Sequence, residues 1–349
     1  MGRIAVGIAL AAVLTSAAGD SDVAALRRQL ACERASERVA AAKRLGRMGP
    51  GAREAGPDLV RALEDDYWDV RRATVRALEA VGPDTGATVP AVSALLGHAH
   101  YGTRRSAAEV LGRLGPKASA AVPDLTKALG DPAPEVRWWA AWALGRMGPA
   151  AAPAVGSLAE LVVHDSDDAA GRHAARALAQ LGTTASEAIP ELVEALKTGT
   201  DAARGRASVA LGGLGRAAVA GLVEVVRGPN KPSAWSAIEA LARIGPEADE
   251  AVPVLAEVIE KEDQWFQALA AGALGDVGAA AAAAAPSLLR LMEKPYADGR
   301  RAAAEALGKI GSDTDTVVKA LKAASKDEDT SVSRAAEEAL KQLRSGAGE

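Results

Sequence analysis

The side chains that most often carry out catalysis or hold metals are few in this chain. The four histidines are His98, His100, His164 and His173. His98 and His100 lie in a predicted turn, where they could contact a metal, but no strong set of ligands accompanies them. A triad built on His164 and the adjacent Asp165 would need stacked helices to bring a serine close by accident. The sequence therefore predicts no catalytic residue, no metal site and no cofactor.

Two other candidates for chemistry are predicted to be structural. The glycine-rich run at 212–215 is expected to be a helix end, and no GxxxxGK[ST] loop is present. Cys32 is the only cysteine, so no intramolecular disulfide can form. We expect Cys32 to be a small residue on a helix rather than a reactive thiol.

Binding chemistry is suggested by one segment that concentrates tryptophan and arginine. Residues 135–148 read EVRWWAAWALGRMG, and three of the chain's six tryptophans, Trp138, Trp139 and Trp142, fall within five positions. Tryptophan and arginine are the residues most enriched at binding hot spots. Whether these rings face a partner or a neighbouring helix depends on the elements that carry them.

Composition narrows the class of protein. The 349 residues are 49% hydrophobic and 25% charged, with a formal net charge of −4. Such a balance is not typical of a chain that coats nucleic acid through bulk charge. Alanine and glycine are abundant and aromatic residues make up only 3%, which favours closely packed helices.

One motif recurs along the chain at a nearly constant interval. Segments such as LGRMG at 45–49 and LGKIG at 307–311 begin with the repeat leucines Leu45, Leu78, Leu111, Leu144, Leu178, Leu211, Leu241, Leu274, Leu307 and Leu340. The successive intervals are 33, 33, 33, 34, 33, 30, 33, 33 and 33 residues, and such a period indicates a repeat architecture. The short interval predicts either a local change of superhelix geometry near 215–235 or a loop deletion.

Prolines and glycines divide each repeat into two helices. A proline 12 residues after the leucine is expected in the first turn of a helix A, at Pro57, Pro90, Pro123, Pro190, Pro253 and Pro286. Helix B ends at the leucine motif, whose closing glycine suits a left-handed C-cap. The leucine, a small residue four positions earlier and an apolar residue three positions later form one stripe on helix B. One hairpin cannot bury this stripe alone, so the hairpins are expected to stack.

Units such as DPAPEVRWWAAWALGRMGP (131–149) and YADGRRAAAEALGKIG (296–311) resemble HEAT repeats of the short class named after phycobilisome lyases. The resemblance covers residues 20–344. It implies an all-α fold, a right-handed superhelical α-solenoid of about ten helical hairpins whose B helices line the concave surface. It is a weak guide to function. Deoxyhypusine hydroxylase is built of similar repeats and binds two irons through His-Glu pairs, but no histidine here is followed by Glu.

The N-terminus is predicted to be a signal peptide. Arg3 precedes a short apolar run at 4–14, and the small residues Ser16, Ala17 and Ala18 precede an expected cleavage point. The alternative is a buried first helix. We expect a signal peptide at 1–18, the solenoid at 19–344 and a disordered tail at 345–349. The mature protein would be periplasmic or secreted, with no membrane span.

Helical periodicity predicts which residues of helix B face outward. Counted from the repeat leucine, positions −6, −2 and +2 lie opposite the buried stripe. In the first five units they carry nine basic residues and one acidic residue, and in the last five units four of each. The candidate binding surface comprises Arg72, Arg76, Arg105, Arg113, Trp138, Trp142, Arg146, Arg172, Arg176 and Trp235. The alternative is that the indoles fill gaps between B helices and the arginines only solubilise them.

A second arginine column is predicted to be structural. It lies at position −7 and comprises Arg38, Arg71, Arg104, Arg137, Arg204 and Arg300. Asp65 and Asp131 lie six residues before Arg71 and Arg137. In similar repeats such acid–arginine pairs form a ladder that ties neighbouring units together. The aromatic residues at 67–68 and 265–266 are expected to cover the ends of hairpins.

These observations predict a non-catalytic protein-binding scaffold or adaptor. The basic, tryptophan-bearing surface of units two to five would engage an acidic or extended protein partner, and nucleic acid is not expected as a partner. Two alternatives stay open. One is an enzyme or enzyme accessory related to repeat-containing lyases and hydroxylases. The other is a structural spacer with no specialised surface.

Overall fold

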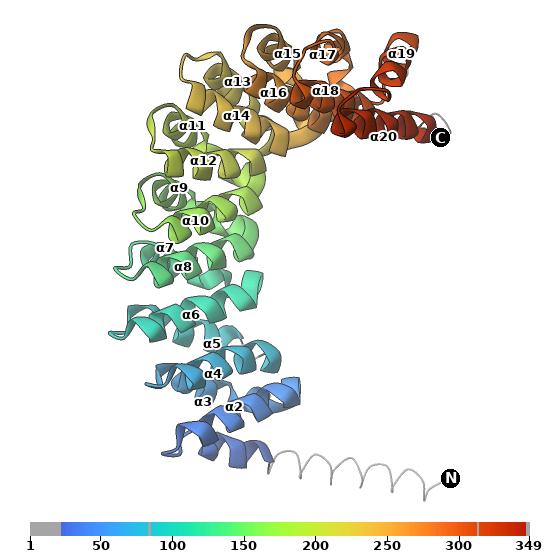
Figure 1. The fold of residues 1–349 in the computed structure, drawn as a ribbon. Coiled ribbons are helices and arrows are strands. Elements are labelled where there is room, and N and C mark those ends of the chain that lie inside the picture. Colours follow the sequence, from blue (N-terminus) through green and yellow to red (C-terminus); the bar gives the residue numbers. More distant parts are fainter. Residues whose placement is uncertain (1–21, 83–84, 313, 347–349) are drawn as a thin grey trace, which may run out of the picture. The chain divides into compact units, whose positions relative to one another are not determined.

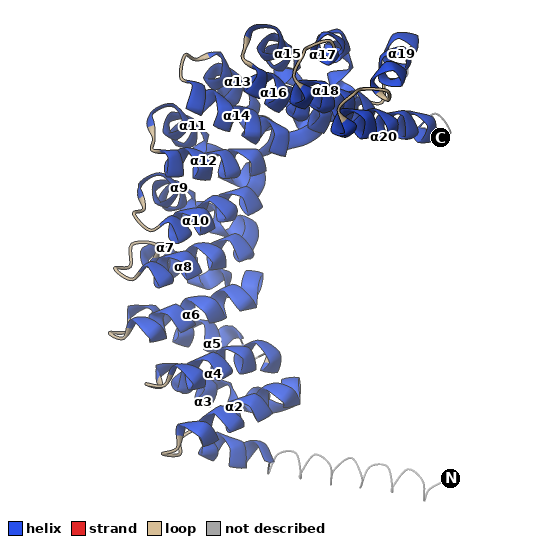
Figure 2. Cartoon of the chain, in the orientation of Figure 1, coloured by secondary structure: helices blue, strands red, loops and turns tan. Residues whose placement is uncertain are grey.

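The computed structural model describes residues 22–82, 85–312 and 314–346, and these residues form helices and no strand (Figure 2). The helices follow one another as repeated hairpins (Figure 1), which confirms the predicted all-α solenoid of HEAT-like units. The chain divides into two compact units, residues 1–157 and 158–349, and each is described by itself. The predicted signal peptide at 1–18 lies outside the described residues. The handedness of the superhelix stays a prediction.

In the first unit, a helix at 22–29 precedes an alternation of B and A helices. The B helices are α2 (Ala35–Met48), α4 (Trp68–Val81), α6 (Tyr101–Leu114) and α8 (Pro134–Met147). The A helices are α3 (Gly56–Arg61), α5 (Thr85–Ala94) and α7 (Val122–Ala128). Short 3₁₀ segments lie between them, at η1 (Gly49–Ala55), η2 (Ala62–Glu64), η3 (Leu95–Gly97), η4 (Gly115–Ala121) and η5 (Gly148–Ala154).

The second unit continues the same alternation, and α9 (Val155–His164) begins in the first unit and ends in the second. Its B helices are α10 (Asp168–Leu181), α12 (Asp201–Gly213), α14 (Lys231–Ile244), α16 (Gln264–Val277), α18 (Ala297–Ile310) and α20 (Thr330–Gly346). Its other A helices are α11 (Ile189–Thr198), α13 (Val219–Arg227), α15 (Val252–Lys261), α17 (Ala285–Met292) and α19 (Asp315–Ala324). The 3₁₀ segments are η6 (Gly182–Ala188), η7 (Gly215–Ala218), η8 (Gly245–Ala251) and η9 (Gly278–Ala284).

These elements bear on two predictions from the sequence, the disordered tail at the C-terminus and the shortened repeat. Helix α20 contains Ser345 and Gly346, the first two residues of the predicted disordered tail, while 347–349 lie outside the described residues. The three-residue shortening of one repeat lies in η7, which has four residues where η6 and η8 have seven. The shortening is therefore a deletion in a connection, and α12 and α14 still pack together.

A glycine with positive φ ends helix B in nine repeats, from +55° at Gly182 to +74° at Gly311. The predicted left-handed C-cap is only partly right. Gly82 and Gly311 adopt the αL conformation. At Gly49 and Gly148, however, the positive φ is combined with ψ of −138° and −145°. That region is open essentially to glycine alone, and it directs the chain into the 3₁₀ segment before the next helix A.

Five of the six column prolines lie in the first turn of an A helix, as predicted, at Pro57, Pro123, Pro190, Pro253 and Pro286. Pro90 is the exception, because it lies inside α5, which begins at Thr85. The segment that forms a 3₁₀ turn in the other repeats is already helical here, so the start of this A helix is earlier than predicted.

The buried stripe of helix B forms the core. Nine of the ten repeat leucines are fully buried, whereas Leu340 in the last described hairpin is partly exposed. Neighbouring B helices approach closely at the glycine that follows the leucine. A Cβ added at Gly46 would lie 3.2 Å from Ala77 Cα, and one added at Gly308 would lie 2.8 Å from Ala339 Cα. The grooves between adjacent B helices therefore have floors of glycine and alanine.

One apolar run, Gln264–Met292, is long and apolar enough to cross a membrane by length and composition alone. In the structure it comprises α16, η9 and α17, with Gly278 at a φ of +69° between the two helices. Half of its most apolar window is buried. The buried helices of a repeat protein pass the same test, so the run is weak evidence for a membrane span.

Candidate binding site on the helix-B face

Some of the basic residues singled out from the sequence form hydrogen bonds within the fold, and the arginines at position −7 are the clearest example. Arg104 donates from Nε and Nη2 to the carboxylate of Asp131, 27 residues later, at 2.6 and 2.8 Å. Its Nη1 donates to the carbonyl oxygens of His98 and Ala99 in its own A–B turn. Such a two-pronged, charge-assisted contact is strong and directional. The same arrangement joins Arg38 to Asp65, Arg104 to Asp131 and Arg300 to Asp327.

Acid–arginine pairs tie neighbouring repeats together at three places, as predicted, but with another register: the Asp65 and Asp131 carboxylates bind Arg38 and Arg104 of the preceding repeat rather than Arg71 and Arg137. Each arginine binds the aspartate of the following repeat and the turn carbonyls of its own repeat. The hydrogen bonds from Arg300 lower the pKa of Asp327. Arg71 lacks this partner because His98 stands where the ladder aspartate would be. Its Nη1 donates only to its own turn, and burial lowers the pKa of Arg71.

At one further place the ladder arginine is supplied by a neighbour, which sequence reasoning missed. Position −7 of the fifth repeat is Gly171, and a Cβ there would lie 2.4 Å from Nη1 of Arg206. Arg206 belongs to the next repeat, is buried, and donates to the carbonyl oxygens of Val163 and Asp165 at 3.4 and 3.2 Å. The missing side chain at Gly171 was the signal in the sequence, but nothing in the sequence pointed to Arg206.

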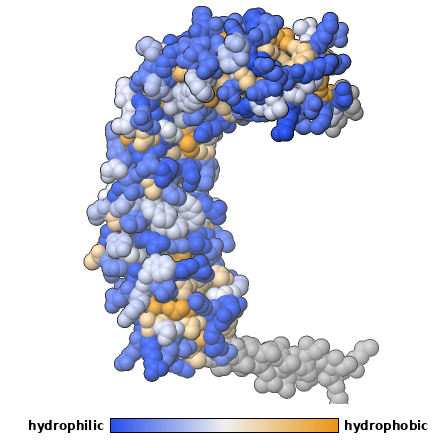
Figure 3. All heavy atoms as spheres, viewed as in Figure 1, coloured by the Kyte–Doolittle hydropathy of each residue, from blue (hydrophilic) through white to orange (hydrophobic). Residues whose placement is uncertain are grey.

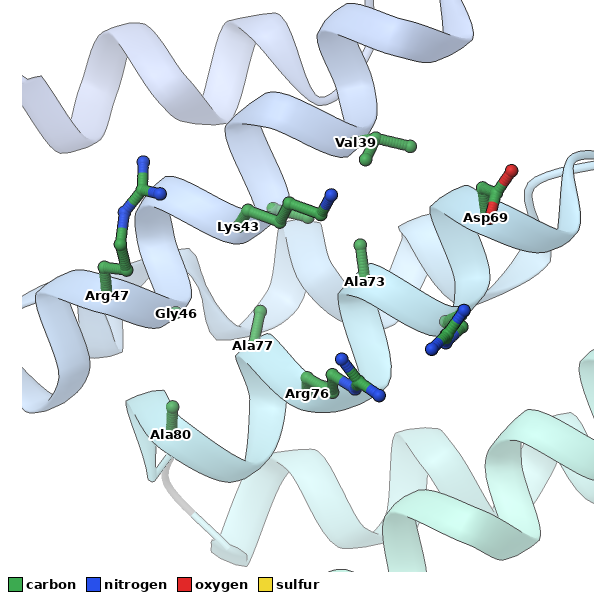
Figure 4. A pocket seen from close by; sticks show the side chains of 11 residues that line it. Val39, Lys43, Gly46, Arg47, Asp69, Ala73, Arg76, Ala77 and Ala80 are labelled. Atoms are coloured by element: carbon green, nitrogen blue, oxygen red, sulfur yellow. The ribbon is translucent and has the colours of Figure 1, made fainter.

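The first open groove of the helix-B face lies between α2 and α4 and has a volume of about 370 Å³ (Figure 4). Its floor is built of Ala42, Gly46, Ala73, Ala77 and Ala80. Lys43 and Arg47 project from α2, and Arg72 and Arg76 from α4. The four cations are exposed, and none forms a salt bridge within the described residues. We call this the α2–α4 groove.

Two more residues complete the rim of the α2–α4 groove. Asp69 is the one carboxylate that lines it. The Arg72 guanidinium lies 5.0 Å from the centre of the Trp68 ring, a cation–π contact that orients the arginine. Trp68 is 47% exposed, and its expected role of covering the end of the hairpin stays a prediction. Its i, i+4 spacing to Arg72 was the signal that sequence reasoning did not use.

Of the other turn aromatics, Tyr67 and Trp265 are exposed as well, and only Phe266 is buried. The role of covering hairpin ends stays a prediction for these residues. On the face shown in Figure 3, hydrophilic residues predominate and apolar residues form small patches between them. The face in this view is therefore mostly hydrophilic.

The groove between α6 and α8 has the same register but is filled. Trp138, Trp139 and Trp142 occupy the positions that Arg72, Ala73 and Arg76 occupy on α4. A Cβ added at Gly112 of α6 would lie 2.4 Å from Cζ3 of Trp142, so this indole covers the glycine.

The three indoles also contact one another and an arginine of α6. Trp139 stacks on Trp138 with a centroid distance of 4.5 Å and meets Trp142 edge-on at 5.0 Å. The Arg105 guanidinium lies 5.8 Å from the Trp139 ring. All three indoles are half-buried. Trp139 contacts both of the other rings and lies at the centre of this indole cluster.

The remaining predicted arginines of the first unit differ in their partners. Arg113 pairs with Glu79 at 2.6 Å and with Glu109 at 3.1 Å, so its charge is largely satisfied. Arg146 is exposed and has no salt bridge within the described residues. Periodicity placed both at position +2 and could not distinguish them.

Three of the predicted residues lie in the second unit. Arg172 pairs with Asp168, and it lines a groove of about 270 Å³ between α10 and α12 together with Arg176. Trp235 is half-buried, donates from Nε1 to Glu239 at 3.3 Å, and meets Phe266 edge-on at 5.5 Å. The ten predicted residues are divided between the units, seven in the first and three in the second, and a single binding surface made of all ten stays a prediction.

A groove between α18 and α20 in the second unit matches the α2–α4 groove position by position and has a volume of about 410 Å³. It is lined by Glu305, Lys309, Arg334 and Glu338, two acids and two bases. Lys309 pairs with Asp276 at 2.8 Å. Residues 1–157 have 20 Lys and Arg against 16 Asp and Glu, and residues 158–349 have 21 against 29. By these counts the first unit carries a net positive charge and the second unit a net negative charge.

The histidines and the cysteine do not assemble into a site. Among the described residues, no group of three or more His, Cys, Asp or Glu side chains could hold a metal ion. Nδ1 of His98 accepts a hydrogen bond from the backbone N–H of His100 at 3.0 Å. Cys32 is half-buried, with Sγ 3.5 Å from the carbonyl oxygen of Arg34.

The stacked hairpins, the buried leucine stripe and the grooves between B helices define an α-solenoid. The chain belongs to the HEAT-repeat family: HEAT repeats match at 88–169, 122–212 and 219–308. A PBS lyase HEAT-like repeat matches at 299–327. No curated protein matches the chain.

Several solved structures are similar. A mutant of Kap121p is 13% identical with a TM-score of 0.61, and the match covers 93% of this chain and 42% of Kap121p. A structure in which Kap95p binding induces the switch loops of RanGDP to adopt the GTP-bound conformation is 14% identical, with a TM-score of 0.52. That match covers 94% of this chain and 51% of the other. An engineered protein is 24% identical over 93% of this chain and 99% of its own length, with a TM-score of 0.43. The chain thus spans about half the length of the first two, and the likeness shows the fold.

Proposed function

We propose that the protein is a non-catalytic binding protein whose first unit engages an acidic, extended segment of a protein partner on the helix-B face. One observation carries the proposal: four exposed cations, Lys43, Arg47, Arg72 and Arg76, surround the α2–α4 groove without an acidic partner of their own. Arginine forks favour carboxylates because they can bind both oxygens at once.

The chemistry of the rest of the chain supports binding over catalysis. Several titratable groups with a perturbed pKa belong to the ladder and to surface ion pairs, such as Asp327 beside Arg300 and Glu260 beside Arg290. These groups lie on the structural ties of the solenoid rather than in a cleft. Kap95p, which has a similar fold, binds RanGDP, so such a fold is compatible with protein recognition. Export to an extracytoplasmic compartment remains part of the proposal.

The test is a binding titration with a matched control. A fluorescein-labelled peptide of alternating glutamate and glycine is titrated with wild type, Arg72→Ala/Arg76→Ala and Arg172→Ala/Arg176→Ala. Both double variants remove positions −6 and −2 of one helix B, on α4 and on α10. We expect the α4 variant to bind about tenfold more weakly, as two charge contacts of about 0.7 kcal/mol each are lost.

The control variant on α10 should bind within about twofold of wild type, because Arg172 is already paired with Asp168. Affinity should also fall as salt screens the charges. Equal losses in both double variants would show a diffuse charge effect and would contradict a site on the first unit. No binding by wild type at low salt would reject the proposed function.

A further inference from the structure

We infer that the α2–α4 groove is a pocket for one apolar side chain, so that the preferred partner segment has an apolar residue flanked on both sides by Asp or Glu. This inference rests on the proposed function and specifies the chemistry of its partner. It concerns the floor of the groove, whereas the proposed function concerns only its charges.

The floor of the groove is apolar and open. Ala73 and Ala77 of α4 and Ala42 of α2 are buried, and Ala80 is exposed at one end. The three atoms nearest to a Cβ added at Gly46 all belong to Ala77, at 3.2 to 3.8 Å, so the closest neighbour of this glycine is an alanine rather than a long side chain. A volume of about 370 Å³ lies in the range of small-ligand pockets, about 300–1,000 Å³, and exceeds what one aliphatic side chain needs.

The charges surround this floor on two sides. Lys43 and Arg47 come from α2 and Arg76 comes from α4 (Figure 4). Arg72 also belongs to α4 and lines the groove. A segment that places an apolar side chain on the alanines therefore passes cations before and after that residue. Charge complementarity requires acids at those flanking positions. Asp69, the single carboxylate, disfavours acid only at its own end of α4.

The same molecule shows that the space between two B helices accepts a large apolar group. In the groove between α6 and α8, Trp142 lies over Gly112, and Trp139 occupies the position that Ala73 has on α4. There the chain fills the groove with its own side chains. Between α2 and α4 the corresponding residues are Ala73 and Arg76, so the floor is left for an external group.

An acidic peptide explains the groove better than a nucleic acid strand. Phosphate contacts need cations and carry most nucleic-acid affinity, but they need no alanine floor. The apolar floor and the flanking cations together match a peptide in which apolar and acidic residues alternate.

The experiment blocks the floor and leaves every cation in place. Ala73→Trp gives α4 the residue that α8 has at the same position, and Ala335→Trp makes the matched change on α20. The probes are two fluorescein-labelled peptides of equal length and charge, acidic throughout, with a central leucine in one and a central glycine in the other. We expect wild type to bind the leucine peptide about tenfold more tightly, the effect of burying one such side chain. Ala73→Trp should abolish this preference, and Ala335→Trp should keep it.

Ala80→Leu is a second blocking variant, because Ala80 is exposed at the end of the floor and its replacement costs little stability. It serves if circular dichroism shows that Ala73→Trp does not fold. Equal binding of both peptides by wild type, with both weakened by Arg72→Ala/Arg76→Ala, would overturn the inference and leave the proposed function standing. A single-stranded DNA of equal length that binds more tightly than either peptide would overturn both.

Discussion

Two grooves of the first unit have the same backbone arrangement but differ in the side chains that line or fill them. Between α2 and α4 the floor is open and four unpaired cations surround it. Between α6 and α8, two repeats further along the chain, indoles occupy the same positions. There Arg105 contacts the Trp139 ring, and Arg113 pairs with Glu79 and Glu109. In a HEAT-like stack the backbone offers a groove at every repeat, and the side chains at −6, −5 and −2 decide whether it is a packing surface or a site.

The groove between α18 and α20 adds a third version. It is open, but its two acids offset its two bases, and Lys309 is already paired with Asp276. An open groove alone therefore does not identify a binding site in this chain. Openness and unpaired charge coincide in the α2–α4 groove.

The largest expected effect comes from emptying the filled groove. Trp139→Ala/Trp142→Ala should lower the free energy of unfolding by about 4 kcal/mol, because two half-buried indoles leave the Gly112 surface uncovered. Urea denaturation followed by circular dichroism measures it. Trp68→Ala is the control and should cost less than about 0.5 kcal/mol, since Trp68 is exposed. Unchanged stability of the double variant would mean that the indoles are free to serve a partner.

The next effect separates arginines that tie repeats together from arginines that face outward. Asp131→Ala should destabilise the protein by about 3 kcal/mol, because Arg104 loses both of its carboxylate hydrogen bonds in a mostly buried place. Arg76→Ala should change stability by less than about 0.5 kcal/mol. The same denaturation experiment compares the two. A similar loss in both variants would contradict the division between ladder and surface.

A smaller effect tests whether side chains of adjacent repeats share one space in the second unit as well. Gly171→Ala should cost about 2 kcal/mol, because its Cβ would overlap the Arg206 guanidinium. Combined with Arg206→Ala, the cost of adding the methyl group should largely disappear. The double-mutant cycle measures this coupling. Additive effects would show that Arg206 does not depend on the missing side chain at Gly171.

The smallest expected effect is a pH dependence of thermal stability, which distinguishes paired from unpaired charges. Arg300 holds the pKa of Asp327 below its usual range. That stabilisation is present above about pH 4, the unfolded pKa of aspartate, and is lost as the pH falls through the lower folded value. Thermal melts at pH 7 and pH 3 should show a smaller acid-induced loss for Asp327→Asn than for wild type. Arg76→Ala is the control and should melt in parallel with wild type, because Arg76 has no salt bridge within the described residues.

Much of the fold follows from local sequence. The repeat leucines predict the period, the small residues at −4 help to predict the buried stripe, and the closing glycines predict the helix ends. The structure confirms these predictions, with two exceptions: the start of α5 and the ψ angles of most closing glycines. The −7 arginines and Asp131 predicted the ladder, but the structure was needed to show which arginine each aspartate binds, as for Arg104 and Asp131. These features need only helical periodicity and the conformational range of glycine and proline, which one chain segment already contains.

The site depended on tertiary structure. Periodicity gives the direction of a side chain from its own helix, but not what the neighbouring helix brings within reach. Arg113 and Arg76 both face outward by sequence, yet Glu79 and Glu109 pair with the first, whereas the second has no salt bridge in the part of the chain that the structure describes. Trp142 and Arg76 share a register, yet one covers Gly112 and the other borders an open floor. Sequence alone determined the hairpin and its outward positions, and packing between repeats decided which of those positions are free, because charge pairing and groove filling are contacts between residues about 30 positions apart.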